Sequence, residues 1–210
     1  NRAGDPQPSA DIHTGGFRLM PRFGDAVDGN IEVAMQTGER GEFDQDGLMV
    51  DAVLNWHLPV APSMKPCVGA GWYYLSGDDP GTDDDEGWDP LWARWPQYSE
   101  LYIYAFDADG AGRWSNVSMP HADLSLMLPG DIKLKALAGY MYAVEEDGPG
   151  GGDKRGVLAT ARADFTLAQA LFCEKDRLGG HVVFEWFDPD DYYNVDDDAH
   201  FARVELTYGF

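Results

Sequence analysis

The sequence predicts an all-β fold of antiparallel strands, and three observations carry this prediction. Apolar and polar residues alternate along nine segments, as they do in strands whose two faces meet different surroundings. Turn-forming residues are plentiful, with 25 Gly and 13 Pro among 210 residues, and aromatic residues make up 13%. No run of about 18 apolar residues exists that would cross a membrane as a helix, whereas a membrane-spanning strand needs only about 9–11 residues.

The last segment of the chain shows the alternation most clearly. One face carries the charged residues Arg203 and Glu205, while the other face is apolar and ends in the aromatic residues Tyr208 and Phe210. Eight earlier segments repeat the pattern, three of them more weakly. The nine predicted strands cover residues 12–23, 30–38, 48–58, 66–76, 122–128, 132–143, 157–167, 181–187 and 201–210.

The predicted connections alternate between short and long. Counted backwards from Phe210, every short connection falls at one end of the strands and every long one at the other. Short periplasmic turns and longer outer loops are typical of outer-membrane barrels. The short connections lie around residues 24–29, 58–65, 129–131 and 172–179; the long ones cover 77–117, 144–155 and 188–198, with 39–46 assigned to them by position.

The two faces and the two kinds of connection together predict an antiparallel up-and-down transmembrane β-barrel in a bacterial outer membrane. Outer-membrane lipid and lipopolysaccharide are the expected partners of its apolar face. Nine spanning strands are an odd number for a bacterial barrel, so residues 1–210 are expected to form one domain that is about half of a larger barrel. Residues 77–117 then form one long extracellular loop, in which 101–106 are predicted to pair with 113–117 in a hairpin around the turn at 107–112.

The charge balance excludes one class of partner. The formal net charge is −22, and such an acidic chain repels the phosphates of nucleic acids. The two cysteines, Cys67 and Cys173, fall about four predicted strands apart, which is too far for a disulfide.

Three stretches resemble alginate-export-type outer-membrane proteins. They are GAGWYYLSGDDPGTDDDEGWDP, which begins at Gly69; the closing stretch HVVFEWFDPDDYYNVDDDAHFARVELTYGF, which begins at His181; and IEVAMQTG, from Ile31 to Gly38. The resemblance runs from about residue 12 to residue 210. It implies the C-terminal half of a barrel of roughly 18 strands, with passage of a polysaccharide or another solute through an arginine-lined pore.

The predicted register points charged residues of both signs toward the lumen, which departs from an arginine-lined pore. Two interpretations remain open: a field that selects solutes, as charged rings do in pores, or mutual neutralisation that stabilises the wall. The inward cations are Arg18, Arg40, Lys133, Lys135, Arg162 and Arg203, and the inward carboxylates are Glu32, Asp51, Asp123, Asp164, Glu185 and Glu205.

The long loop carries two candidate binding features. Asp83, Asp84, Asp85 and Glu86 offer oxygen ligands for Ca²⁺, although their spacing fails the EF-hand pattern, and the alternative is a solvated acidic loop. No other cofactor is expected. Three tryptophans, Trp88, Trp92 and Trp95, offer flat faces for stacking on sugar rings, or alternatively form an aromatic cluster that pins the loop.

Catalysis is not expected, because neither a His-Glu-x-x-His zinc motif nor a Gly-x-Ser-x-Gly elbow occurs. Ser118 and His121 are close in sequence but three positions apart, so in a strand they point to opposite faces. The expected function is a passive pore for solutes, including anionic oligosaccharides or polysaccharides. Two alternatives remain: a surface barrel that binds glycans or Ca²⁺, and a soluble carbohydrate-binding β-sandwich whose apolar faces are buried against a second sheet.

Overall fold

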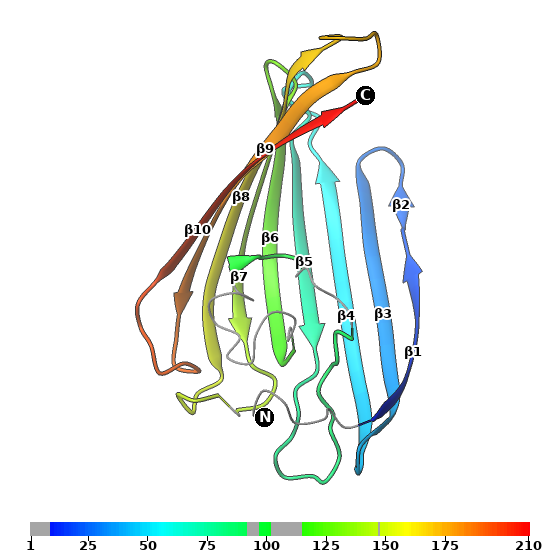
Figure 1. The fold of residues 1–210 in the computed structure, drawn as a ribbon, viewed down its shortest axis with the longest axis vertical. Helices are drawn as coiled ribbons and strands as arrows, with labels where there is room; N and C mark the ends of the chain where they lie inside the picture. Colours follow the sequence, from blue (N-terminus) through cyan, green and yellow to red (C-terminus); the bar gives the residue numbers. More distant parts are fainter. Residues whose placement is uncertain (1–8, 92–96, 102–114, 147) are drawn as a thin grey trace.

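The computed structural model describes residues 9–91, 97–101, 115–146 and 148–210, which form one antiparallel sheet of ten strands (Figure 1). The strands are β1 (Ala10–Leu19), β2 (Arg22–Phe23), β3 (Val27–Arg40), β4 (Phe43–His57), β5 (Cys67–Leu75), β6 (Val117–Leu128), β7 (Ile132–Tyr142), β8 (Lys154–Gln169), β9 (Arg177–Pro189) and β10 (Ala199–Gly209).

The sheet is a meander, in which each long strand pairs with the next long strand along the chain. Its order is β1-β3-β4-β5-β6-β7-β8-β9-β10, and the two-residue strand β2 pairs with β3 beside this path. The described strands do not close into a barrel, so β1 and β10 are the two edges. Because the path holds nine antiparallel strands, β1 and β10 run in the same direction (Figure 1).

Each of the nine predicted segments overlaps one strand of this path, but several predicted boundaries were wrong; β6 begins at Val117 and not at 122, and β9 begins at Arg177 and not at 181. Residues 39–46 were grouped with the long connections, whereas β3 and β4 pair as far as Arg40 and Phe43 and leave only a two-residue turn. Gly41 makes this turn possible with a left-handed φ of 69°. The predicted strand at 12–23 is interrupted, because Pro21 cannot donate a backbone hydrogen bond; β1 ends at Leu19 and β2 follows separately.

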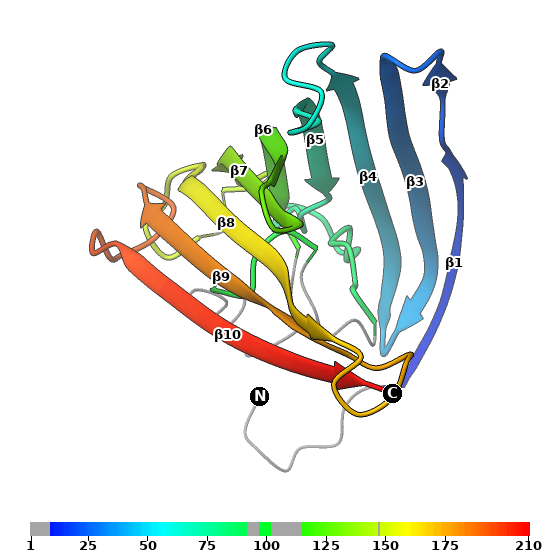
Figure 2. The same cartoon turned by 90° about the horizontal axis from the view of Figure 1, so that it is seen from above.

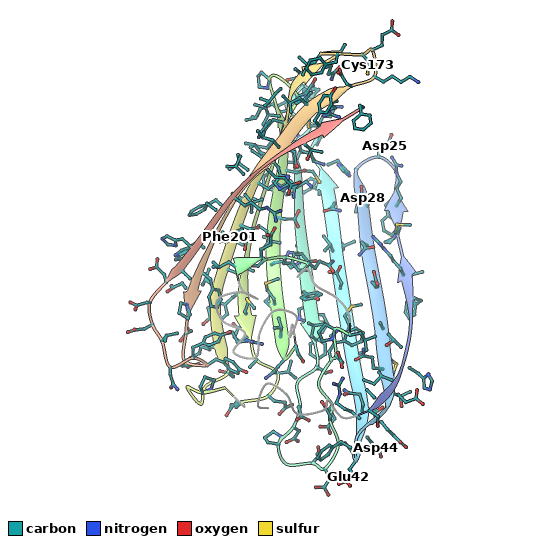
Figure 3. All side chains as sticks on the ribbon, viewed as in Figure 1. Asp25, Asp28, Glu42, Asp44, Cys173 and Phe201 are labelled. Atoms are coloured by element: carbon teal, nitrogen blue, oxygen red, sulfur yellow. The ribbon has the colours of Figure 1, made fainter. Side chains whose placement is uncertain are left out.

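The connections divide between the two ends of the sheet. The end that carries Asp25 and Cys173 has the shorter connections, and we call it the turn end (Figure 3). The opposite end, which carries Glu42 and Asp44, holds the two longest connections, and we call it the loop end (Figure 3). The predicted alternation of short and long connections is confirmed for the two longest connections, 76–116 and 143–153. It fails at the tight turn between β3 and β4, and connection 58–66 at the turn end is as long as connection 190–198 at the loop end.

The sheet curves strongly (Figure 2), and the side chains on its two faces differ in character. Apolar side chains on the convex face are open to the surroundings: Leu206 is 61% exposed and Phe184 is 48% exposed. On the concave face, by contrast, charged side chains are among the covered ones: Glu185, next to Phe184, is 3% exposed. This inverts the usual burial pattern. The β-sandwich alternative requires a second sheet over the apolar face, and no such sheet is present within the described ranges.

A small apolar core lies on the concave face toward the loop end. It consists of Tyr73, Leu75, Leu101, Val117, Met119, Met141, Leu158 and Phe187. Trp88 and Tyr98 pack against it, so the connection between β5 and β6 folds onto the concave face. Most of the hairpin predicted for 101–106 and 113–117 lies outside the described residues, although Val117 itself begins β6 and pairs with Leu75.

Within the described ranges, no helix has the length and hydropathy to cross a bilayer.

Candidate functional site

Residues 97–101, which we call the strap, cross the concave face and are anchored by two buried carboxylates on distant strands. The first anchor is Asp51 on β4, which is 3% exposed. Its two oxygens accept hydrogen bonds from Gln97 Nε2 at 2.5 Å and from the Tyr98 hydroxyl at 2.6 Å. Burial and the hydrogen bond to Asp51 raise the pKa of Tyr98 above its ordinary value, because both disfavour the phenolate.

The second anchor is Glu185 on β9, which binds the other end of the strap. Its carboxylate accepts hydrogen bonds from Ser99 Oγ at 2.6 Å, from the Glu100 amide at 3.1 Å and from the Leu101 amide at 2.9 Å. A carboxylate with several hydrogen-bond donors is well stabilised even where water is excluded. The strap is therefore fixed to strands on both sides of the concave face.

An ion pair joins the strap to the edge strand β10. Arg203 donates a hydrogen bond to the Glu100 carboxylate over 2.6 Å, and its other terminal nitrogen lies 3.1 Å from His181 Nε2. Burial raises the pKa of Glu100, Arg203 opposes that shift, and the nearby Glu185 carboxylate adds to it. The charged form of Glu100 therefore depends on Arg203.

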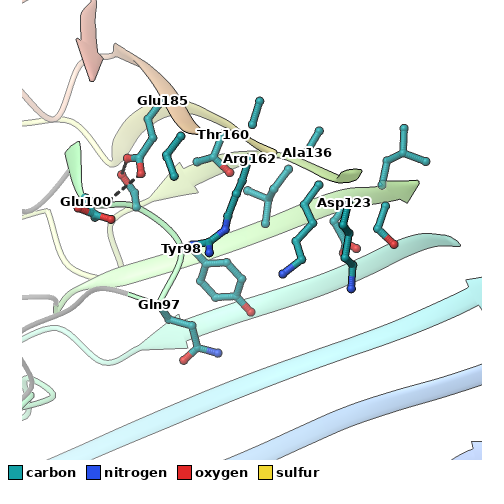
Figure 4. A pocket seen from close by; sticks show the side chains of 16 residues that line it. Gln97, Tyr98, Glu100, Asp123, Ala136, Thr160, Arg162 and Glu185 are labelled. Atoms are coloured by element: carbon teal, nitrogen blue, oxygen red, sulfur yellow. Dashed lines mark hydrogen bonds between the residues drawn. The ribbon is translucent and has the colours of Figure 1, made fainter. Parts of the chain in front are cut away.

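A cavity of about 500 Å³ lies between the strap and strands β6 to β9 (Figure 4). Lys133 and Lys135 of β7 line it, and neither has a salt-bridge partner among the described residues. Arg162 of β8 also lines it, but two of its nitrogens bind one oxygen of Asp164 at 2.9 and 2.6 Å. The cavity thus holds two lysines that remain available to a ligand.

The strand register sets the cationic groups side by side. Lys135 of β7 pairs with Arg162 of β8, Arg162 with Val183 of β9, and Val183 with Arg203 of β10. Three cations therefore share one row across four strands, and we call them the cationic row. Asp123 and Glu185 lie one step toward the loop end, and Asp164 and Glu205 lie one step toward the turn end.

Two glycines of β5 make room for charged and polar side chains of β6. A Cβ at Gly69 would lie 2.2 Å from the Asp123 carboxylate, and one at Gly71 would lie 2.5 Å from the His121 ring. His121 stacks near Tyr98 with ring centroids 4.9 Å apart, and its ring nitrogens have no hydrogen-bond partner within the described part of the chain. The glycines thereby let these groups gather beneath the strap.

Ser118 and His121 do not form a catalytic pair. Ser118 accepts a hydrogen bond from Trp72 Nε1 at 3.0 Å, whereas His121 lies under the strap on the concave face. The prediction that the two residues point to opposite faces is confirmed.

The beginning of the long loop is bound to β3. Arg40 forms a very short ion pair with Asp89, and Gln36 both donates to the Asp89 carbonyl at 2.7 Å and accepts from its amide at 2.8 Å. Trp88 packs against the apolar core instead of standing free for a ligand. Trp92 and Trp95 lie outside the described residues.

The acidic loop is folded by its own hydrogen bonds. Asp85 accepts from the Gly87 amide at 3.1 Å, and Glu86 accepts from the Thr82 hydroxyl at 2.9 Å. Among the described residues, no three His, Cys, Asp or Glu side chains are grouped so that they would hold a metal ion. The side chains of Asp83, Asp84, Asp85 and Glu86 therefore do not gather in a group of three, and a Ca²⁺ site at this loop stays a prediction.

The remaining predicted lumen residues lie apart from the cavity. Arg18 is 3.9 Å from Glu32 near the β1 edge, and Glu205 of β10 is 3.9 Å from His181 of β9. Both cysteines are free. Of the predicted residues, Lys133, Lys135, Arg162, Asp123 and Glu185 meet at one cavity.

Sequence reasoning missed the strap. Gln97, Ser99 and Glu100 belong to no alternating segment, and the contacts that hold them join residues as much as 103 positions apart. The sequence held only an indirect signal of the strap: Asp51 and Glu185 were predicted to point inward, where a carboxylate requires hydrogen-bond donors. In comparisons with known proteins, no family model and no curated protein matches this chain.

Proposed function

We propose that this chain forms part of the wall of a bacterial outer-membrane pore that passes anionic solutes, such as acidic oligosaccharides, by passive diffusion along the concave face. The resemblance to alginate-export-type proteins suggests the same. The observation that carries the proposal is the inverted burial pattern, with exposed apolar side chains on the convex face and charged side chains on the concave face.

The convex face has the layout expected for lipid. Aromatic residues stand near the strand ends, with Tyr74 and Tyr142 at the loop end and Trp56 and Tyr208 at the turn end. The outward residues of β7 run from Ile132 to Tyr142, which at about 3.4 Å per residue and a tilt of about 40° covers about 25 Å. An apolar band of about this height, flanked by aromatic girdles, suits a bilayer.

The free edges fit a larger barrel. Since β1 and β10 run in the same direction, an all-antiparallel barrel requires an odd number of further strands between them. Nine further strands would give the barrel of roughly 18 strands that the resemblance implies.

The concave face supports the choice of anionic solutes. The cavity is lined by Lys133, Lys135 and Arg162 and also by the carboxylates of Glu100, Asp123 and Glu185. Glu185 is engaged by the strap and Glu100 by Arg203, whereas the two lysines have no salt-bridge partner among the described residues. Fixed charges facing a wet passage favour solutes of the opposite sign.

Single-channel recording of the full-length protein in planar bilayers tests this function. Changing Arg162 and Arg203 to Ala should shift the reversal potential in a salt gradient toward cation selectivity. Lys175→Ala, in the exposed connection at the turn end, is the control for loss of a cation. Absence of any channel would reject the proposal.

A further inference from the structure

We propose that Glu100 of the strap is a built-in competitor for the solute, whose carboxylate occupies Arg203 until an anionic solute displaces it and loosens the strap. This inference rests on the proposed function and adds a coupling between solute binding and the width of the passage. The observation behind it is the ion pair of 2.6 Å between Glu100 on the strap and Arg203 on the wall.

The strap offers Arg203 the same chemical group that an acidic sugar would offer. A carboxylate and a guanidinium form charge-assisted hydrogen bonds whatever molecule carries the carboxylate. Glu100 therefore blocks one end of the cationic row, while Lys135 at its other end remains without a salt-bridge partner among the described residues. In the strand register, Arg162 lies two strand spacings and Lys135 three strand spacings from Arg203, the group that Glu100 occupies.

The position of Glu100 makes it displaceable. Its carboxylate is largely buried, with 16% of the side chain exposed, and its backbone amide donates to the carboxylate of Glu185. Burial is the main cause that raises the pKa of Glu100, and repulsion from the nearby Glu185 carboxylate adds to it. Exchange of Glu100 for a solute carboxylate relieves this repulsion and returns Glu100 to water.

Loss of the Glu100 contact weakens the strap without destroying its anchors. Asp51 and Glu185 hold Gln97, Tyr98, Ser99 and Leu101, whereas Arg203 holds Glu100. A solute therefore removes one contact of several, and the strap loosens reversibly when the solute leaves.

The test uses Glu100→Gln, which keeps the size of the side chain and removes its charge. Glucuronate is the probe and glucose the uncharged control, with affinity measured by calorimetry on the full-length protein in detergent micelles. We expect Glu100→Gln to bind glucuronate about tenfold more tightly, because the competing charge-assisted hydrogen bond is lost. In an Arg203→Gln background the same change should have little effect.

Glu205→Gln is the matched control for electrostatics alone. Glu205 is on the concave face of β10, two residues from Arg203, so its removal changes the local charge equally and leaves the Glu100–Arg203 pair intact. An affinity gain in Glu205→Gln as large as that in Glu100→Gln would overturn the inference.

Hydrogen exchange provides a second measurement that does not depend on a channel. Saturating glucuronate should speed exchange at the Glu100 and Leu101 amides of the wild-type protein, and glucose should not. Unchanged protection of these amides would overturn the inference even if the protein conducts. Conversely, a protein that shows the exchange response but no conductance would reject the proposed function and leave the competition by Glu100 supported.

Discussion

The carboxylate of Glu185 on β9 accepts a hydrogen bond of 2.9 Å from the backbone amide of Leu101, 84 positions earlier in the chain. Together with the Ser99 hydroxyl and the Glu100 amide, this contact makes Glu185 the main attachment of the strap to the far side of the sheet. A single side chain therefore couples a wall strand to the segment that narrows the concave face.

Glu185→Gln should release this end of the strap. The amide keeps one acceptor oxygen but loses the charge, so we expect about 2 kcal/mol of lost stability and faster exchange at the Glu100 and Leu101 amides. Hydrogen exchange followed residue by residue checks this result. Equal protection in Glu185→Gln and the wild type would show that the strap is held elsewhere.

Asp51→Asn should lower the pKa of Tyr98. In the wild type, burial and the hydrogen bond to Asp51 favour the neutral phenol, so the phenol stays protonated above the ordinary tyrosine pKa of about 10. The stability that comes from this shift is present below about pH 10 and is lost as pH rises through the folded-state pKa. An alkaline titration followed by phenolate absorbance should show one tyrosine ionising at lower pH in the variant, with Tyr98→Phe identifying the signal.

Asp176 should make the connection between β8 and β9 sensitive to acid. Burial alone would raise the pKa of Asp176, but hydrogen bonds from the Phe172, Cys173 and Leu171 amides and from the Tyr208 hydroxyl lower it overall. A lowered pKa gives stability that is present above about pH 4 and lost as pH falls through the folded-state value. Thermal melting between pH 2 and 6 should therefore show a steeper loss in the wild type than in Asp176→Asn.

The two faces of β10 allow a direct comparison of neighbouring positions. Val204 is 67% exposed on the convex face, whereas Glu205 faces the concave side. If the convex face meets lipid, Val204→Arg should cost about 2–4 kcal/mol of stability near the bilayer midplane, and Glu205→Arg should cost far less. Folding into lipid vesicles, followed by the heat-dependent gel shift of folded barrels, measures the difference, and equal effects would contradict a lipid-facing surface.

Gly71→Ala should disturb the site beneath the strap. The added Cβ would lie 2.5 Å from the His121 ring and 2.8 Å from the Ala52 carbonyl, a clash that we expect to cost about 1–3 kcal/mol. Adding His121→Ala to the Gly71→Ala variant should remove only the share of the lost stability that comes from the clash with the His121 ring, because the clash with the Ala52 carbonyl remains. Denaturant unfolding measures both effects, and Gly15→Ala, where nothing lies within 4 Å of the new Cβ, is the control.

The strands were predictable because their two faces differ chemically at every second residue. In β8, for example, Arg162 and Asp164 alternate with Ala161 and Ala163, so the residue pattern fixes both the strand and its inward face. The tight turn at Gly41 was missed, because the position of 39–46 among the long connections outweighed the local turn chemistry. In addition, the alternation of apolar and polar residues is weak around Arg40 and Phe43, so it does not show where β3 ends and β4 begins.

The candidate site was predictable only on its wall side. The inward positions of Lys133, Lys135 and Arg162 follow from the period of two, and they do meet at one cavity. The strap side depends on where a long connection folds back, and no periodic pattern encodes the contact of Tyr98 with Asp51 or of Glu100 with Arg203. Such contacts follow from tertiary geometry alone.

The exposed apolar convex face has a consequence for how the chain reaches its fold. Most domains collapse in water by driving such side chains inward, but here inward collapse would place Leu206 and Phe184 where Arg203 and Glu185 belong. A large apolar patch left in water invites self-association. If the convex face meets lipid, as proposed, assembly of this sheet calls for an amphiphile, supplied as detergent in the test tube, to shield the convex face while the strands pair.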